Sequence, residues 1–162
     1  MADLARFRSA QDSPHDGFAT ALAELRAGRK RSHWIWYVFP QLAGLGQSST
    51  AIHYGLAGVD EAIAYLRDPV LGERLVTAAG VVRAHLSASS PVRLETLMGS
   101  HIDALKLVSC MTLFDAVAKR VSASDRAPRL AALAEDADAI LAAAASQGYS
   151  RCAFTERTLA SA

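Results

Sequence analysis

The sequence is poor in cysteine and has almost no net charge, and each shortage excludes a class of protein. Its two cysteines, Cys110 and Cys152, are too few for a disulfide framework, so a reduced cytosolic protein is the simplest expectation. The formal net charge of +1 argues against general nucleic-acid binding, which needs a strongly basic surface. No apolar run approaches the ~20 residues that span a bilayer, and the charged start MADLARFRSAQDS shows no signal peptide. We therefore expect a cytoplasmic protein without a membrane partner.

Motifs for metals and common cofactors are also missing. His15, His85 and His101 have no partner at metal-ligand spacing, and the two cysteines form no zinc pattern. The sequence has no Walker loop and no nucleophile elbow, and Gly44-x-Gly46 alone is too short for a dinucleotide fingerprint. The sequence therefore predicts no metal and no cofactor, and it leaves open whether the protein is an enzyme.

Helical periodicity, in contrast, runs through most of the chain. Apolar residues make up 51% and charged residues 20%, which is an ordinary globular balance, and 162 residues suit one domain. Phe18, Leu22 and Leu25 recur at i, i+4 and i+7, which places them on one face of a helix. Similar patterns predict helices near residues 4–10, 52–56, 60–66, 69–86, 94–97, 101–120 and 128–147, with a helical turn in the tail. We expect an all-α fold: one compact domain over residues 1–162 with about seven helices.

Capping residues mark several of the predicted helix ends. Gly28 suits the position just after a helix, because glycine takes the left-handed conformation without a Cβ clash. Ser48 or Ser49 can cap the next helix through its side-chain oxygen, and we expect Asp60 to cap another. Asp68, followed by proline, is the strongest start signal, since proline at the first helical position loses no hydrogen bond.

The predicted helix over residues 101–120 is apolar nearly all round, which is typical of a helix at the centre of a core. Five polar residues recur at every third position of this helix: Asp103, Lys106, Ser109, Thr112 and Asp115. Each touches the next in a narrow stripe, and the lysine and serine three apart make Ser-Lys nucleophilic chemistry geometrically conceivable. The plainer alternative is an Asp103–Lys106 ion pair with buried hydroxyls bonded to the preceding turn.

The strongest candidate for a site is the stretch over residues 28–49. Its cations and aromatics follow one another closely: Arg29, Lys30, Arg31, His33, Trp34, Trp36, Tyr37 and Phe39. Neither alternation nor helical period decides the form of residues 34–39, so we expect a short helix or an irregular buried segment. A break near Phe39 is expected because Pro40 disfavours helix at the residue before it.

An anion with an aromatic part, such as a nucleotide or an ADP-ribosyl group, would suit this stretch. Cations pair with phosphate, tryptophan faces stack on bases, and a helix capped by serine presents free amides. We predict His33 and Lys106 as catalytic residues, because histidine has a pKa near 6.5 that suits acid or base chemistry. The predicted ligand-binding residues are Arg29, Arg31, Trp34, Trp36, Gln41, Ser48, Ser49, Ser109 and Thr112.

Two other interpretations stay open. The aromatic side chains can all belong to the core, with the three cations of residues 29–31 exposed to solvent around them. Alternatively, Trp34 and Trp36 can anchor a protein–protein interface or a homodimer, because tryptophan is enriched at interface hot spots. The ligand hypothesis requires Lys106 and Ser109 to face the aromatic stretch, so that a polar pocket lined by aromatic side chains results.

Several of these motifs resemble a bacterial family, the domain of unknown function numbered eighteen-ten. Residues 29–41, with the Gly-Leu-Gly that follows, are similar to its signature, and residues 61–72 and 103–114 match in order. The resemblance covers about residues 3–119 and implies an all-helical fold without an established activity.

Two positions depart from the family pattern. Cys110 lies where the family usually has a second serine, and Val108 lies where it often has arginine. Some members carry the label calpastatin, an inhibitor type that is disordered until it binds its target. We reject that label for this chain because its apolar fraction and capping signals are those of a prefolded domain.

Overall fold

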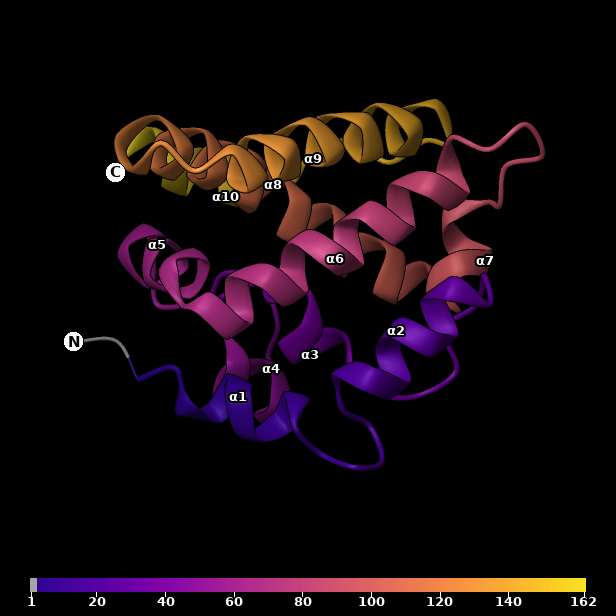
Figure 1. Cartoon of the computed structure of the whole chain (residues 1–162), viewed down its shortest axis with the longest axis horizontal. Helices are drawn as coiled ribbons and strands as arrows, with labels where there is room; N and C mark the ends of the chain where they lie inside the picture. The colour runs from indigo at the N-terminus through magenta and orange to yellow at the C-terminus, as the bar shows by residue number, and fades with distance from the viewer. Residues whose placement is uncertain (1–2) are drawn as a thin grey trace.

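Ten helices make up most of the chain that the computed structural model describes, which is residues 3–162 (Figure 1). They are α1 Ala5–Gln11, α2 Phe18–Arg26, α3 Ile35–Val38, α4 Ser49–Tyr54, α5 Val59–Arg67, α6 Pro69–Leu86, α7 Leu94–Met98, α8 His101–Asp125, α9 Pro128–Ser146 and α10 Ala153–Ala160. Within these residues the β-type pairing is one isolated parallel bridge. The all-α prediction is confirmed, and the helix count exceeds about seven because short segments such as α3, α4 and α7 fold as separate helices.

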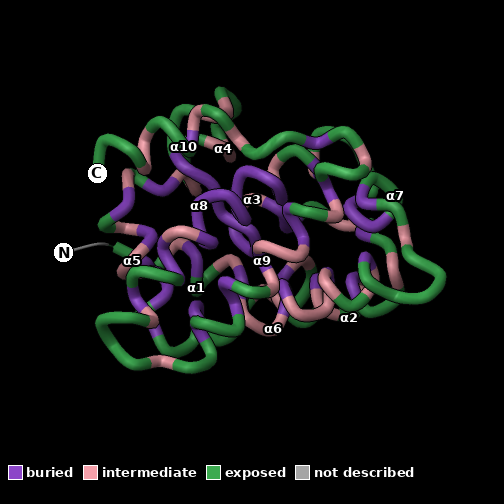
Figure 2. Tube along the Cα trace, turned by 90° about the horizontal axis from the view of Figure 1, so that it is seen from above, coloured by how far each residue is buried: buried purple, intermediate pink, exposed green. Residues whose placement is uncertain are grey.

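Helix α8 is the centre of the hydrophobic core. Helices α3, α5, α7, α9 and α10 all pack against it, and α9 also packs on α6. Figure 2 shows the buried parts of α8 and α3 running through the middle of the molecule. The prediction of a central apolar helix is confirmed, although α8 continues to Asp125 where the sequence suggested an end near Arg120. The single domain over residues 1–162 stays a prediction, and residues 1 and 2 lie outside the described part.

Most of the predicted caps are present. Gly28 has a φ of 86° after α2. Ser48 Oγ accepts a hydrogen bond from the amide of Ala51, in the first turn of α4, at 3.1 Å. Asp68 Oδ1 accepts hydrogen bonds from two amides in the first turn of α6 at 3.0 and 2.9 Å. The cap predicted at Asp60 is wrong, because α5 already begins after Gly58 and Asp60 lies in its first turn. There its carboxylate favours the positive end of the helix without capping it.

The aromatic stretch folds as one buried helical turn, α3, followed by an extended chain. Phe39 leaves the helix with φ −123° and ψ 73°, which confirms the break expected before Pro40. The carbonyl of Gln41 then accepts a hydrogen bond from the amide of Leu56 at 2.9 Å, next to the bridge between Leu42 and Leu56. This pairing fixes the backbone of Gln41.

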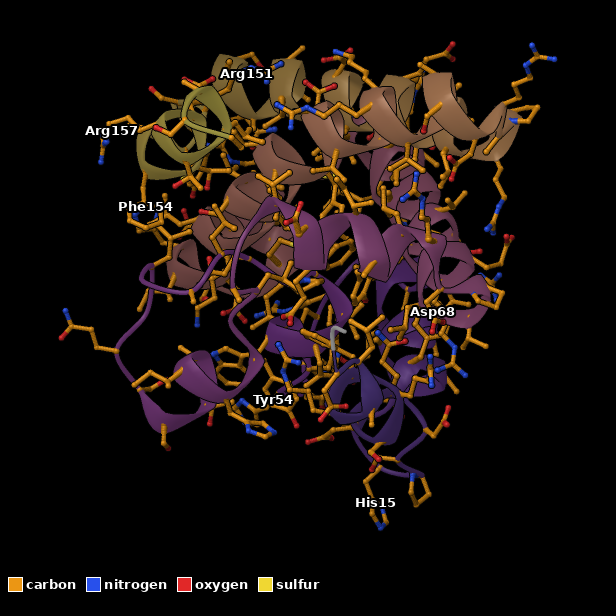
Figure 3. All side chains as sticks on the ribbon, turned by 90° about the vertical axis from the view of Figure 1, so that its left-hand side faces the viewer. His15, Tyr54, Asp68, Arg151, Phe154 and Arg157 are labelled. Carbon is orange, nitrogen blue, oxygen red and sulfur yellow. The ribbon has the colours of Figure 1, made fainter. Side chains whose placement is uncertain are left out.

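The C-terminal part returns across α8. Gly148, with a φ of 92°, follows α9, and residues 149–152 connect it to α10. Figure 3 shows Arg151 and Phe154 at the α10 side of the molecule, with Tyr54, the last residue of α4, well away from them. None of the helices within residues 3–162 is both long and apolar enough to cross a bilayer.

Candidate functional site

The polar stripe of α8 meets the aromatic stretch at its N-terminal end. Asp103 Oδ2 lies 2.8 Å from Lys30 Nζ, a buried cation that also lies over the ring of Trp34 at 5.0 Å. Lys106 Nζ lies 4.7 Å above the ring of Trp36, and its distance to Asp103 Oδ1 is 3.9 Å. The carboxylate thus pairs closely with Lys30, and the charge of Lys106 has only a distant partner.

The same stripe holds the C-terminal connection at its other end. Thr112 Oγ1 accepts a hydrogen bond from the amide of Cys152 at 3.2 Å. Arg151 forms ion pairs with Asp115 at 3.1 Å and with Asp138 of α9 at 3.3 Å. Residues 151 and 152 are therefore fixed on α8 by side chains that the sequence showed only as a polar stripe.

The hydroxyl groups of the stripe follow the plainer of the two interpretations. Ser109 Oγ donates to the carbonyl of Leu105 at 3.1 Å, and Thr112 Oγ1 donates to the carbonyl of Val108 at 2.7 Å. Such bonds to the preceding turn satisfy a hydroxyl inside a helix. Since each proton is already donated, neither hydroxyl is oriented toward the amine of Lys106 for Ser-Lys chemistry.

A hollow of about 470 Å³ lies between the two ends of the stripe, within the size range of small-molecule sites. One side is α8 with Lys106 and Ser109, and the others are Gln41 and the connection over residues 148–152. We call it the α8 hollow. Two exposed apolar side chains of α8 also line it: Ile102, 63% exposed, and Leu105, 45% exposed. A cation, an amide and apolar side chains therefore line one space.

Gln41 has an unusual environment within this space. It is only 9% exposed, and no hydrogen bond formed within residues 3–162 uses its side-chain amide. It also lines a small adjoining cavity of about 10 Å³ together with Trp36 and Lys106. The indole Nε1 of Trp36 is likewise buried without an acceptor in the described part of the chain. Buried polar groups are normally paired, so the unpaired indole, with the Gln41 amide beside it, marks a place suited to a polar ligand group.

Trp34 lies apart from the α8 hollow. It is 0% exposed, and its Nε1 donates to Glu24 Oε1 at 2.9 Å. For Trp34 and Phe39 the interpretation as core is therefore correct, and Trp34 offers no face for stacking or for an interface. Trp36 differs, because it is half-buried and reaches Lys106.

The remaining predicted residues do not converge on the α8 hollow. His33, Trp36 and Ser49 line a separate open depression of about 570 Å³ beside α4. Lys106 lines the α8 hollow and the small adjoining cavity, whereas His33 lines the depression beside α4, so these spaces do not bring the predicted catalytic pair together. Four further residues line neither space: Arg29, Arg31 and Ser48, which are exposed, and Thr112, which is buried.

Sequence reasoning missed the third side of the hollow. Tyr149, whose hydroxyl lies 3.0 Å from His101 Nδ1, and Cys152 both line it. Burial raises the pKa of the Cys152 thiol, but the polar groups around the sulfur outweigh burial and lower the pKa below its usual value. They are the side chain of Ser109, the hydroxyl of Thr155 and the first amides of α10. The only signal for this contact was that the polar stripe continued past Ser109.

Comparison with known proteins gives relatives without an established activity. The chain is similar to the conserved hypothetical protein Rv1873 from Mycobacterium tuberculosis, with 40% sequence identity over 86% of this chain and 85% of that one. The TM-score with the crystal structure of that protein is 0.70. No curated protein gives a significant match. Residues 1–133 match the family described as "Protein of unknown function (DUF1810)", which confirms the resemblance seen in the sequence. The chain belongs to this DUF1810 family.

Proposed function

We propose that the protein binds a small anion with an aromatic or apolar part in the α8 hollow. The convergence of Lys106 and Gln41 on one space is the observation that carries this proposal. Lys106 supplies a cation whose carboxylate neighbour lies 3.9 Å away, and Gln41 supplies amide donors and an acceptor that bond to no other group within residues 3–162. Nucleotides and ADP-ribosyl groups are a ligand class that combines the required charge with a ring.

The two ends of such a ligand would meet different side chains. Its anionic group would lie near Lys106 and Gln41, where a single carboxylate, Asp103, is shared by Lys30 and Lys106. Its ring would lie against Leu105 and Ile102, whose exposed surface a ligand would remove from water. We propose no reaction, because His33 and Lys106 are not in one hollow. We infer a cytoplasmic location, which both free thiols support.

A second candidate is a protein interface, and a different observation favours it. Ile102 and Leu105 lie one turn apart on α8 and are both exposed, so in a homodimer they would be buried against the same two residues of the partner chain. This interface would replace the tryptophan-anchored one suggested by the sequence, because Trp34 is fully buried. Light scattering after size-exclusion chromatography separates the two candidates: a dimer that Leu105→Asp dissociates supports the interface.

The test of the ligand proposal is a thermal-shift screen against nucleotides, NAD, ADP-ribose and sugar phosphates. A ligand at 100 times its dissociation constant should stabilise the wild-type protein by about 2.7 kcal/mol. Lys106→Met should abolish most of that shift. Arg120→Met is the matched control, because it removes the same charge from the same helix and Arg120 is exposed and lines a different space. If no compound shifts the melting temperature of the wild type, the proposed ligand class is wrong.

A further inference from the structure

The α8 hollow also contains a thiol for which the proposed function has no role. Of the two cysteines, Cys110 is fully buried, whereas Cys152 is partly exposed and lines the hollow. Building on the proposed anion site, we propose that Cys152 is a modification site, where the thiolate attacks a small anionic disulfide held in the hollow. The product is a mixed disulfide between the protein and one half of that reagent.

The position of the sulfur is fixed by its neighbours. The amide of Cys152 is bonded to Thr112, and the preceding Arg151 is held by two carboxylates. Thr155 Oγ1 donates to Cys152 Sγ at 3.2 Å from within the first turn of α10. A thiolate immediately before a helix is stabilised by the helix amides and by such donors. The sulfur is thus held by donors rather than packed in hydrocarbon.

Two further features of the hollow point to a ligand beside this thiol. The first is Gln41, a side chain about nine-tenths buried that lines the same space and has no hydrogen-bond partner within residues 3–162. The second is the charge distribution. Arg151 is neutralised by two carboxylates, so Lys106 is the cation left to attract an anion. The reagent should therefore carry a carboxylate or a similar anionic group.

The exchange step needs no partner beyond the disulfide itself. The Cys152 proton goes to solvent, and the thiolate sulfur attacks one sulfur of the reagent. A new S–S bond forms as the old one breaks, and the second half leaves as a thiolate that carries the bonding electron pair. The protein thiol is oxidised, and the departing half is the reduced product.

The test compares two reagents on the native protein. Dithiobis(nitrobenzoate) is an anionic aromatic disulfide whose leaving thiolate is coloured, and a dipyridyl disulfide is its neutral counterpart. We expect one thiol per chain to react at least as fast as N-acetylcysteine at neutral pH, and mass spectrometry to locate the label on Cys152. Denaturation should then expose Cys110 as a second reactive thiol, and Cys110→Ser should remove only that second one.

Lys106→Met should slow the anionic reagent by about fivefold, the effect of one unit charge at contact distance in water. It should leave the rate with the neutral reagent unchanged, and Arg120→Met, which removes a charge from α8 outside the hollow, should change neither rate. A native thiol that reacts more than about tenfold slower than N-acetylcysteine, or a Lys106→Met variant with no selective effect, overturns the inference. If no nucleotide shifts the melting temperature but the thiol reacts fast and depends on Lys106, only the proposed nucleotide class is wrong. If ligands shift the melting temperature but the thiol does not react, only the inference about Cys152 is wrong.

Discussion

Glu24 of α2 determines the position of the aromatic stretch, and replacing it with glutamine tests that role. Its Oε1 accepts hydrogen bonds from the amides of Arg31 and Ser32 at 2.7 and 2.9 Å and from Trp34 Nε1 at 2.9 Å. Its Oε2 accepts the Ser32 hydroxyl at 2.5 Å. Burial raises the pKa of Glu24, but these hydrogen bonds outweigh burial and lower the pKa from 4.5 to about 2.

Glu24→Gln keeps the shape and one acceptor but removes the charge from these hydrogen bonds. Bonds to a charged group contribute about 1.5–3 kcal/mol, compared with about 1 kcal/mol for neutral ones. The difference is about 0.5–2 kcal/mol per bond. Because Glu24 is partly exposed and water screens its charge, we expect the variant to lose about 1–2 kcal/mol of unfolding free energy at pH 7 in total.

The pH dependence of this loss follows from the lowered pKa. A carboxyl group whose pKa is lower in the folded state contributes its stability above the unfolded pKa and loses it as pH falls through the folded pKa. The difference in unfolding free energy between wild type and Glu24→Gln should therefore be constant above about pH 5, and it should decrease as pH falls from 4.5 toward 2. Urea unfolding followed by far-UV circular dichroism measures it. A difference that stays the same from pH 7 to pH 3 would refute the reasoning.

Two further predictions concern the parts of the chain that hold the hollow together. Gly99→Ala should destabilise the protein by about 1–3 kcal/mol, because Gly99 has a φ of 83° and a Cβ would lie 2.7 Å from the carbonyl oxygen of Lys30. Gly148→Ala, at φ 92° but with open space around it, should cost less, and equal losses in thermal melts would contradict the steric argument. Thr112→Val removes the acceptor of the Cys152 amide and should speed hydrogen exchange at that amide. Unchanged exchange would show that Thr112 does not position the thiol.

The sequence predicted those features of the fold that depend on local signals. The aspartate-proline start of α6, the glycine after α2 and the continuous apolar face of α8 each report the chemistry of a few neighbouring residues. The end of α8 was predicted too early because its last turns, up to Asp125, are more polar and exposed. Asp60 failed as a cap because several residues near a helix start can serve, and tertiary packing selects one.

The candidate site was predicted only in part, because its geometry depends on contacts between distant segments. The sequence does not distinguish Trp34 from Trp36, because both are tryptophans in the same short segment. In the structure, Trp34 bonds to Glu24 in the core, whereas Trp36 contacts Lys106. The ligand hypothesis required Lys106 to face the aromatic stretch, and of the two tryptophans only Trp36 meets this requirement. Nothing in the local pattern around Cys152 shows that it packs on α8.

An NMR titration with the nucleotide that stabilises the protein most tests the central claim most directly, because it maps the bound surface residue by residue. The account predicts that amide shifts concentrate at Gln41, Ser109 and Cys152, around the α8 hollow. Shifts confined to His33 and Ser49, in the depression beside α4, or no localised shifts at all, would contradict it.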